Sequence, residues 1–303
     1  MEFLYFLESL RSPWLNEFML LITQLGDEIA FLVTALILFW CVDKKRGYYI
    51  LSVGFLGTLA NQFMKLFFRN PRPWVLDQNF TILEQARDGA SGYSFPSGHT
   101  QSSVGTFGGI AYTFKNRWIR IIAIIIAVLV PFSRMYIGVH TPLDVLVAAA
   151  MAVALILLLQ PVFCGNNGRY IPVVFCVMTI LAVAFLCYVE YYPFPTDIDE
   201  HNLLSGIKNA YTLLGALLGL LVVYIVDEKW IQFPTKAVWW VQILKVVFGL
   251  GAVLLVKSGL KVPINALFGT SIGTAVRYFL IGIVAGIIWP LSFRWFARLG
   301  IKE

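Results

Sequence analysis

The sequence predicts an all-α membrane protein, a polytopic bundle of about nine transmembrane helices. Of its 303 residues, 59% are hydrophobic and 13% are charged, whereas soluble domains carry about 25% charged residues. Apolar runs long enough to cross roughly 30 Å of hydrocarbon as helix recur through the whole chain. The loops between these runs are short apart from 70–97, so no separate soluble domain is expected.

Each predicted helix is an apolar run bounded by polar, basic or turn-forming residues. Residues 13–25 predict a short interfacial helix, in which Pro13 takes a first-turn position. Gly26 and Asp27 then interrupt the apolar run, and Asp27 is a suitable N-cap for the first true span, 28–42. The remaining predicted spans are 47–69, 98–114, 118–133, 142–161, 170–190, 207–226, 237–256 and 273–296.

The distribution of basic residues predicts the orientation. With nine spans, most of them fall on one face, which the positive-inside rule makes cytoplasmic. They are Lys44, Lys45, Arg46, Lys115, Arg117, Arg120, Arg169, Lys229, Lys236, Arg294, Arg298 and Lys302. The N-terminus and the loops 70–97, 134–141 and 191–203 then face outward, and the C-terminus lies inside. Topology therefore explains the net charge of +6, and the expected partner is the bilayer rather than a nucleic acid.

Three cations converge on the predicted outward face. Lys65 lies near the end of the second span, Arg72 lies between two prolines, and Arg134 ends the fourth span. A lone lysine near a helix end would snorkel to the interface. Three neighbouring cations, however, repel one another unless an anion lies among them. A phosphoryl group suits this arrangement, because guanidinium forks match two oxygens and a lysine supplies a point charge.

Two histidines lie on the same face. Pro96-Ser97-Gly98-His99 begins the third span, with Ser97 as N-cap and Gly98 open to the close approach of a ligand. The first amides of a helix bind anions, so the same atoms serve either a helix cap or a phosphate cradle.

His140 and Asp144 are spaced i, i+4 at the start of the fifth span. A carboxylate on one ring nitrogen would fix the tautomer and leave the other nitrogen free to attack. Alternatively, Asp144 only caps its own helix.

Together, K-x6-R-P from Lys65, P-S-G-H from Pro96, and S-R-x5-H-x3-D from Ser133 resemble the motifs of the type-2 phosphatidic acid phosphatase superfamily. That family includes membrane lipid phosphatases, glucose-6-phosphatase and the vanadium haloperoxidases. The resemblance covers about residues 60–150. It implies a phosphatase core of six transmembrane helices over residues 1–190, followed by an extension of about three helices over residues 191–303.

The resemblance also implies residue roles. His140 would be the nucleophile that forms a phosphohistidine, and Asp144 would orient it. His99 would protonate the leaving oxygen and then activate water. The phosphoryl oxygens would be held by Lys65, Arg72, Arg134 and the amides of Ser97 and Gly98. No metal and no other cofactor is expected, because three fixed cations supply the charge.

A site at a membrane interface favours a lipid phosphate, such as an isoprenoid diphosphate, a phosphatidate-type lipid or a sphingoid phosphate. The third motif is similar to that of the sphingosine-1-phosphate phosphatases, and the small size suits a bacterial cytoplasmic membrane. A glucose-6-phosphatase-like sugar phosphatase and a lipid phosphotransferase remain alternatives.

The apolar spans argue against a haloperoxidase, and an anion transporter would not need both histidines. The sequence predicts no oligomeric state; His201 is expected at the surface, and Lys245 and Arg277 are unassigned.

Overall fold

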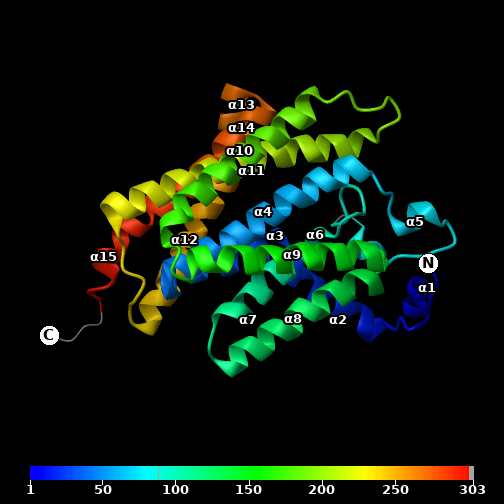
Figure 1. Cartoon of the computed structure of the whole chain (residues 1–303), viewed down its shortest axis with the longest axis horizontal. Coiled ribbons are helices and arrows are strands. Elements are labelled where there is room, and N and C mark those ends of the chain that lie inside the picture. The colour runs from blue at the N-terminus through cyan, green and yellow to red at the C-terminus, as the bar shows by residue number, and fades with distance from the viewer. Residues whose placement is uncertain (88, 300–303) are drawn as a thin grey trace. The chain divides into compact units, whose positions relative to one another are not determined.

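The computed structural model describes residues 1–87 and 89–299. This part of the chain is helical and contains no strand (Figure 1). Seven of its helices are long and apolar enough to cross a membrane. An eighth span is obtained if the pair Pro13–Gly26 and Glu28–Val42, bent by 54°, counts as one. The predicted membrane helix bundle is therefore confirmed.

The expected number of about nine spans differs from this because the predicted span 98–114 is short. The chain is helical from α6 (Gly98–Ser103) through η4 (Val104–Gly108) to α7 (Gly109–Thr113). Phe114 then leaves the helical conformation, with φ −93° and ψ 138°, so the helix stops below the usual length of a span. It packs along α8 (Arg117–Tyr136), as Figure 1 shows.

The predicted span 28–42 is present with the same bounds, as α3 (Glu28–Ile37) and η2 (Leu38–Val42). The other predicted spans are present with shifted ends, as α4 (Lys44–Phe68), α8, α9 (Pro142–Phe163), α10 (Ile171–Tyr191), α11 (Glu200–Val226), α12 (Trp239–Gly259) and α14 (Thr270–Ile283). The last predicted span continues beyond α14 through η7 (Val284–Ile288) and η8 (Pro290–Ser292) to α15 (Phe293–Phe296). The regular α-helix is interrupted near Pro290, because proline has no N–H group to donate to the preceding turn.

Short helices complete the chain. The predicted helix at 13–25 is present as α2 (Pro13–Thr23), followed by η1 (Gln24–Gly26). Apolar runs of membrane length do not predict α1 (Glu2–Ser9), α5 (Pro73–Leu76), η3 (Glu84–Ala86), η5 (Gly168–Tyr170), η6 (Asp227–Ile231) or α13 (Lys261–Phe268). All of these are too short to give a membrane-span signal.

The chain forms two compact units that interleave along the sequence. Unit 1 comprises Met1–Leu32, Ile50–Pro161 and Phe194–Gly206, and unit 2 comprises Val33–Tyr49, Val162–Pro193 and Ile207–Glu303. The division at residue 190 that the family resemblance implies stays a prediction.

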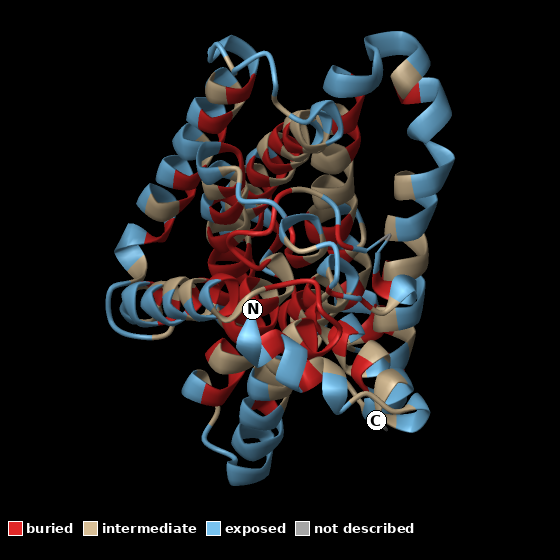
Figure 2. Cartoon of the chain, turned by 90° about the vertical axis from the view of Figure 1, so that its right-hand side faces the viewer, coloured by how far each residue is buried: buried red, intermediate tan, exposed pale blue. Residues whose placement is uncertain are grey.

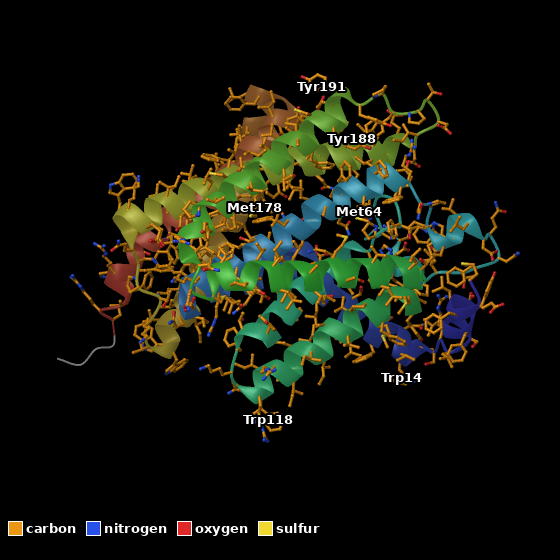
Figure 3. The ribbon with its side chains drawn as sticks, in the orientation of Figure 1. Trp14, Met64, Trp118, Met178, Tyr188 and Tyr191 are labelled. Atoms are coloured by element: carbon orange, nitrogen blue, oxygen red, sulfur yellow. The ribbon has the colours of Figure 1, made fainter. Side chains whose placement is uncertain are left out.

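Apolar side chains cover the outer faces of the unit 1 helices. On α8, Ile122 and Val128 are 57% and 62% exposed, which suits a helix that faces lipid. Long helices carry buried and exposed positions along the same ribbon (Figure 2). Trp14 and Trp118 project away from α2 and α8 (Figure 3) and are exposed, as expected for residues at a lipid headgroup interface.

Two charged side chains of unit 2, Lys44 and Lys245, have local partners. Lys44 forms an ion pair of 2.8 Å with the buried carboxylate of Asp227. The ammonium group of Lys245 donates to the Thr235 carbonyl at 3.1 Å and lies 4.4 Å from the centre of the Phe293 ring. These partners stabilise charged groups away from water, so Lys245 has a structural explanation.

A glycine allows the close approach of α3 to α4 in unit 1. A Cβ atom at Gly54 would stand 2.2 Å from the buried ring of Phe31. We expect Gly54→Ala to destabilise the protein by about 1–3 kcal/mol, because the ring would have to move within a packed core. Thermal unfolding in detergent measures this. Gly251→Ala on α12 is the control, since nothing lies within 4 Å of its Cβ position; equal melting temperatures for both variants would contradict the prediction.

Candidate active site

The end of α4 and the loop after it position two of the predicted cations. Lys65 and Arg72 are only 7% and 6% exposed. The Lys65 ammonium donates to the carbonyl of Tyr93. The Arg72 guanidinium donates to the carbonyls of Ser91, at 2.8 Å, and Gly92, at 3.1 Å. The loop 91–93 therefore holds both cations through its backbone and leaves their charge uncompensated.

The third cation comes from α8. Arg134 is 2% exposed, and its Nη1 donates to Thr23 Oγ1 on α2 at 2.7 Å. Its Nε is buried without a hydrogen-bond partner among the described residues. A charged N–H left unpaired in the interior is costly, and this one remains available to a ligand.

Ser97 begins α6 as its N-cap, and its Oγ accepts from the Thr100 amide at 3.4 Å. The Ser97 amide itself donates to the Asp144 carbonyl at 3.1 Å, which ties α6 to α9. This amide is therefore already engaged, unlike the phosphate donor that the family resemblance implies. The amides of Gly98 and His99 follow at the first two helical positions, where a helix provides no internal acceptor. A Cβ atom at Gly98 would meet only Asn61 Oδ1, at 3.9 Å, so the backbone there is open to approach.

His140 lies between Arg72 and Asp144. Its Nε2 is 2.9 Å from Arg72 Nη1, and its Nδ1 is 3.5 Å from Asp144 Oδ2. Arginine has no acceptor atom, so Nε2 must accept this bond and the ring proton lies on Nδ1. The Nε2 electron pair therefore points to the side of the cations, where it accepts from Arg72.

The environment of His140, in the loop between α8 and α9, favours the neutral ring. Burial lowers the pKa of His140 well below its usual value, and the nearby charges of Arg72, Arg134 and Lys65 lower it further. A neutral imidazole is the form that can attack an electrophile.

The carboxylate of Asp144 takes both of the roles that the sequence left open. Its Oδ2 accepts from the Thr141 amide at 2.7 Å, and Thr141 Oγ1 accepts from the Asp144 amide at 3.3 Å, which is a reciprocal cap of α9. The same Oδ2 accepts from Ser94 Oγ at 2.6 Å and faces the Nδ1 of His140. Capping fixes the carboxylate in the position from which it orients the ring.

The three cations have neutral acceptors only. Within residues 1–87 and 89–299, none of Lys65, Arg72 and Arg134 lies within 4.0 Å of a carboxylate oxygen. At longer range, Asp144 attracts Lys65 and Arg72, and Asp27 attracts Arg134. Three neighbouring buried cations without a paired carboxylate form an arrangement that can accept an anion.

His99 is half-buried beside this cluster, in electrostatic range of Arg134, His140, Arg72 and Lys65. It comes from α6, whereas His140 lies before α9, so the two imidazoles approach the cations from different elements. His201 is exposed at the start of α11. Among the described residues, no group of three His, Cys, Asp or Glu side chains is arranged to hold a metal ion.

The site uses side chains that sequence reasoning missed. Ser94 supports Asp144, and Thr23 holds Arg134. Asn61, one turn before Lys65 on α4, is buried and donates to the Pro96 carbonyl at 3.2 Å. Ser94 adjoins the second motif and Asn61 precedes the first by one turn, so proximity to the motifs signals both. Nothing near Thr23 in the sequence signals its partner.

We expect Thr23→Val to lower kcat/KM about tenfold, because valine keeps the volume but removes the acceptor of a charged donor, a bond of about 1.5–3 kcal/mol. Steady-state kinetics on the detergent-purified protein measure this. Thr23→Ser keeps the hydroxyl group and should stay within about threefold of the wild type. Equal kinetics for the valine and serine variants would contradict a role of Thr23 in holding Arg134.

Comparisons with known proteins agree with this geometry. A family model described as "PAP2 superfamily" matches residues 46–167, which contain every predicted site residue. A second model, "PAP2 superfamily phosphatase, transmembrane extension", matches residues 211–302. No solved structure matches the chain significantly.

Several characterised relatives are phosphatases by name. Phosphatidylglycerophosphatase B of Bacillus subtilis is 32% identical over 165 residues, covering 50% of this chain and 76% of that protein. Undecaprenyl-diphosphatase BcrC of the same species is 34% identical over 111 residues, covering 37% and 54%. Human sphingosine-1-phosphate phosphatase 2 is 24% identical over 195 residues, covering 60% and 47%. The chain thus spans about half the length of the last two relatives.

The family resemblance seen in the three motifs is thereby confirmed. One relative is matched over three quarters of its length at 32% identity, and the two family models match the motif region and the C-terminal helices. The membrane helices, the three buried cations and the pairing of His140 with Asp144 agree with these matches. The chain belongs to the PAP2 superfamily of membrane proteins.

Proposed function

We propose that this protein is an integral membrane phosphatase that hydrolyses a lipid phosphomonoester or diphosphate through a phosphohistidine intermediate. The observation that carries the proposal is the position of His140. Its unprotonated Nε2 accepts from Arg72 at 2.9 Å, while its Nδ1 faces the buried carboxylate of Asp144 at 3.5 Å. A cap or a transport site needs no such nucleophile.

In the first step the phosphoryl group replaces His140 Nε2 as an acceptor for Arg72. Its oxygens are bound by Lys65, Arg72 and Arg134 and by the helix amides at Gly98. Nε2 attacks phosphorus, and the bond from phosphorus to the leaving oxygen breaks. His99 donates its proton to that oxygen. The phosphate dianion among the cations favours the protonated form of His99 before this step.

In the second step His99, now neutral, takes a proton from water, and the water oxygen attacks phosphorus. The bond between phosphorus and His140 Nε2 breaks, and inorganic phosphate leaves. Asp144 stabilises the positive charge that the phosphorylated imidazole carries between the steps. The fixed cations and helix amides stabilise the charge that develops on the phosphoryl oxygens in both transition states.

A lipid is the proposed substrate because the site lies in a membrane protein and several relatives act, by name, on lipid phosphates. We place the site on the outward face of the membrane, with the N-terminus outside and the C-terminus inside, and the bacterial cytoplasmic membrane as the site of action. The basic turns support this orientation.

The test is phosphate release by the purified wild type from a panel of substrates: an isoprenoid diphosphate, phosphatidate, phosphatidylglycerophosphate, sphingosine-1-phosphate and glucose-6-phosphate. Lipid substrates should give the highest kcat/KM. A preference for glucose-6-phosphate would replace the lipid by a sugar phosphate. Product analysis with an acceptor lipid tests for transfer, because a phosphorylated acceptor in place of free phosphate would identify a phosphotransferase.

We expect full activity in excess chelator, since three fixed cations supply the positive charge that a metal ion provides in other phosphatases. Phosphate release is measured before and after dialysis against EDTA. Re-addition of Mg²⁺ to the dialysed protein is the control. Loss of turnover that Mg²⁺ restores would contradict a mechanism based on the protein's own cations.

A further inference from the structure

A second feature of unit 1 adjoins the candidate active site. A pocket of about 930 Å³ is lined by the segment from Arg69 to Val75 and by Arg87 to Tyr93. Residues of the segment 195–202 also contribute to its lining. Arg72, whose Nη1 contacts His140, lies in its wall, so the pocket opens directly beside the proposed nucleophile.

Arg69 is held at this pocket by an unusual backbone conformation. Its φ is 53°, in the left-handed region that residues other than glycine rarely adopt. Its amide donates to the Lys65 carbonyl at 3.0 Å, which fixes the turn at the end of α4. Conformations of this kind persist where the surrounding structure requires them, often at ligand sites. Among the described residues Arg69 forms no ion pair.

Arg87 provides a second guanidinium group in the pocket wall. Glu84 accepts from its Nε at 2.6 Å and from its Nη2 at 2.8 Å, and this fixes the plane of the fork. The Trp74 ring centre lies 5.3 Å from the Arg87 guanidinium carbon and 5.8 Å from that of Arg72. Trp74 therefore orders one arginine of the active site and one of the pocket.

The segment 195–202 contributes two acidic residues to the pocket lining. Asp199 caps α11, accepting from the Asn202 amide at 2.8 Å, so its carboxylate is directed to a helix start. Asp197 has no hydrogen-bond or ion-pair partner among the described residues. The pocket lining thus includes Arg69 and Arg87, which attract an anion, and Asp197, which repels one. A bound anion would therefore favour positions near Arg69, Arg87 and Arg72 over positions near Asp197.

We propose that this pocket is a subsite for the leaving group and that Arg69 and Arg87 bind a negative charge on the leaving group itself. This inference rests on the proposed phosphatase function. The favoured substrate class has a second anionic phosphate next to the transferred one, as in a lipid diphosphate, whose leaving group is a lipid monophosphate. The same pocket also offers apolar surface to the first carbon atoms of the lipid tail, from Trp74, Val75 and Ile198.

The chemical consequence concerns the departing oxygen. When phosphorus moves to His140 Nε2, the bond to the bridging oxygen breaks and the leaving phosphate gains negative charge. His99 supplies a proton to that oxygen, and the two arginines stabilise the remaining charge. A neutral alcohol leaves without such charge, so the arginines bring no comparable gain to a simple phosphomonoester.

The test compares farnesyl diphosphate with farnesyl monophosphate, which share one tail and differ in the charge of the leaving group. Phosphate release is measured on the full-length protein in detergent. Each of Arg69→Gln and Arg87→Gln should lower the ratio of kcat/KM for diphosphate over monophosphate by roughly tenfold, the effect of one charged hydrogen bond. Asp197→Asn should raise that ratio, because it removes a competing negative charge.

The matched control is Arg117→Gln, which removes the same charge. Arg117 lies outside the pocket, at the start of α8, whereas Arg134 of the active site lies at the end of that helix. This variant should leave the ratio unchanged. If the wild type hydrolyses both compounds and neither arginine variant changes the ratio, the subsite is refuted while the phosphatase function stands. A fall of the ratio with Asp197→Asn would also refute it. If the wild type hydrolyses neither these compounds nor any other member of the substrate panel, the proposed function itself fails.

Discussion

Replacing His140 by alanine should reduce phosphate release by roughly 10⁴-fold or more, as expected when the nucleophile of a covalent mechanism is removed. The ring presents an unprotonated Nε2 on the side of the cations and has a carboxylate behind it. No other side chain of the site combines an unprotonated nitrogen with a carboxylate that could stabilise the covalent state, within the part of the chain that the structure describes. Initial rates over the full substrate panel measure the loss.

Two measurements distinguish loss of the nucleophile from loss of the fold. The melting temperature of His140→Ala in detergent should stay close to that of the wild type, because Arg72 Nη1 keeps the Val139 carbonyl as an acceptor at 2.9 Å. Brief exposure to substrate labelled in its phosphoryl group should leave acid-labile label on the wild type and none on the variant. A folded His140→Ala protein that still releases phosphate at more than a few per cent of the wild-type rate would exclude His140 as the nucleophile.

Asp144→Asn should lower kcat by roughly 10²–10⁴-fold, the range known when the carboxylate behind a catalytic histidine becomes an amide. The amide can present a donor to Nδ1, which moves the ring proton to Nε2. Nε2 then has no electron pair for attack and meets a second donor in Arg72, 2.9 Å away. Ser94 and the Thr141 amide also lose a charged acceptor.

Thr141→Val separates capping from catalysis. This substitution removes the hydroxyl acceptor of the Asp144 amide but leaves the carboxylate in contact with Ser94 and His140. It should cost about 1 kcal/mol of stability, as for the loss of a helix cap, with a loss of activity below tenfold. If Asp144→Asn behaves like Thr141→Val in both stability and kinetics, Asp144 acts only as a cap.

Much of the fold could be predicted from apolar segment length, because a hydrocarbon layer imposes the same length on every crossing helix. The bounds of helix 98–113 were predicted to within one residue, but the helix is too short to count as a membrane span. The prediction missed α1 and α13, since helices of eight residues leave no membrane-length signal. These short elements depend on packing within their own unit, which a hydropathy pattern does not register.

The sequence by itself determined the chemistry of the site. Lys65, Arg72, His99, Arg134 and His140 are unusual residues for a chain of this composition, and their spacing in three motifs identified the family. The local spacing of His140 and Asp144 also predicted their contact, because residues i and i+4 at a helix start lie on one face.

Only the tertiary structure decided which atoms these residues use. The hydrogen bond from Arg72, 68 residues away in the sequence, determines the tautomer of His140. The hydroxyl group of Thr23, 111 residues away, accepts from Arg134 and fixes the position of its guanidinium group. The pocket beside the site joins Arg69 and Arg87 to residues 195–202. Such contacts arise when distant segments pack, so their partners follow no sequence period. Residue types establish what a site can do, whereas packing determines which donors remain unpaired and therefore what the site can bind.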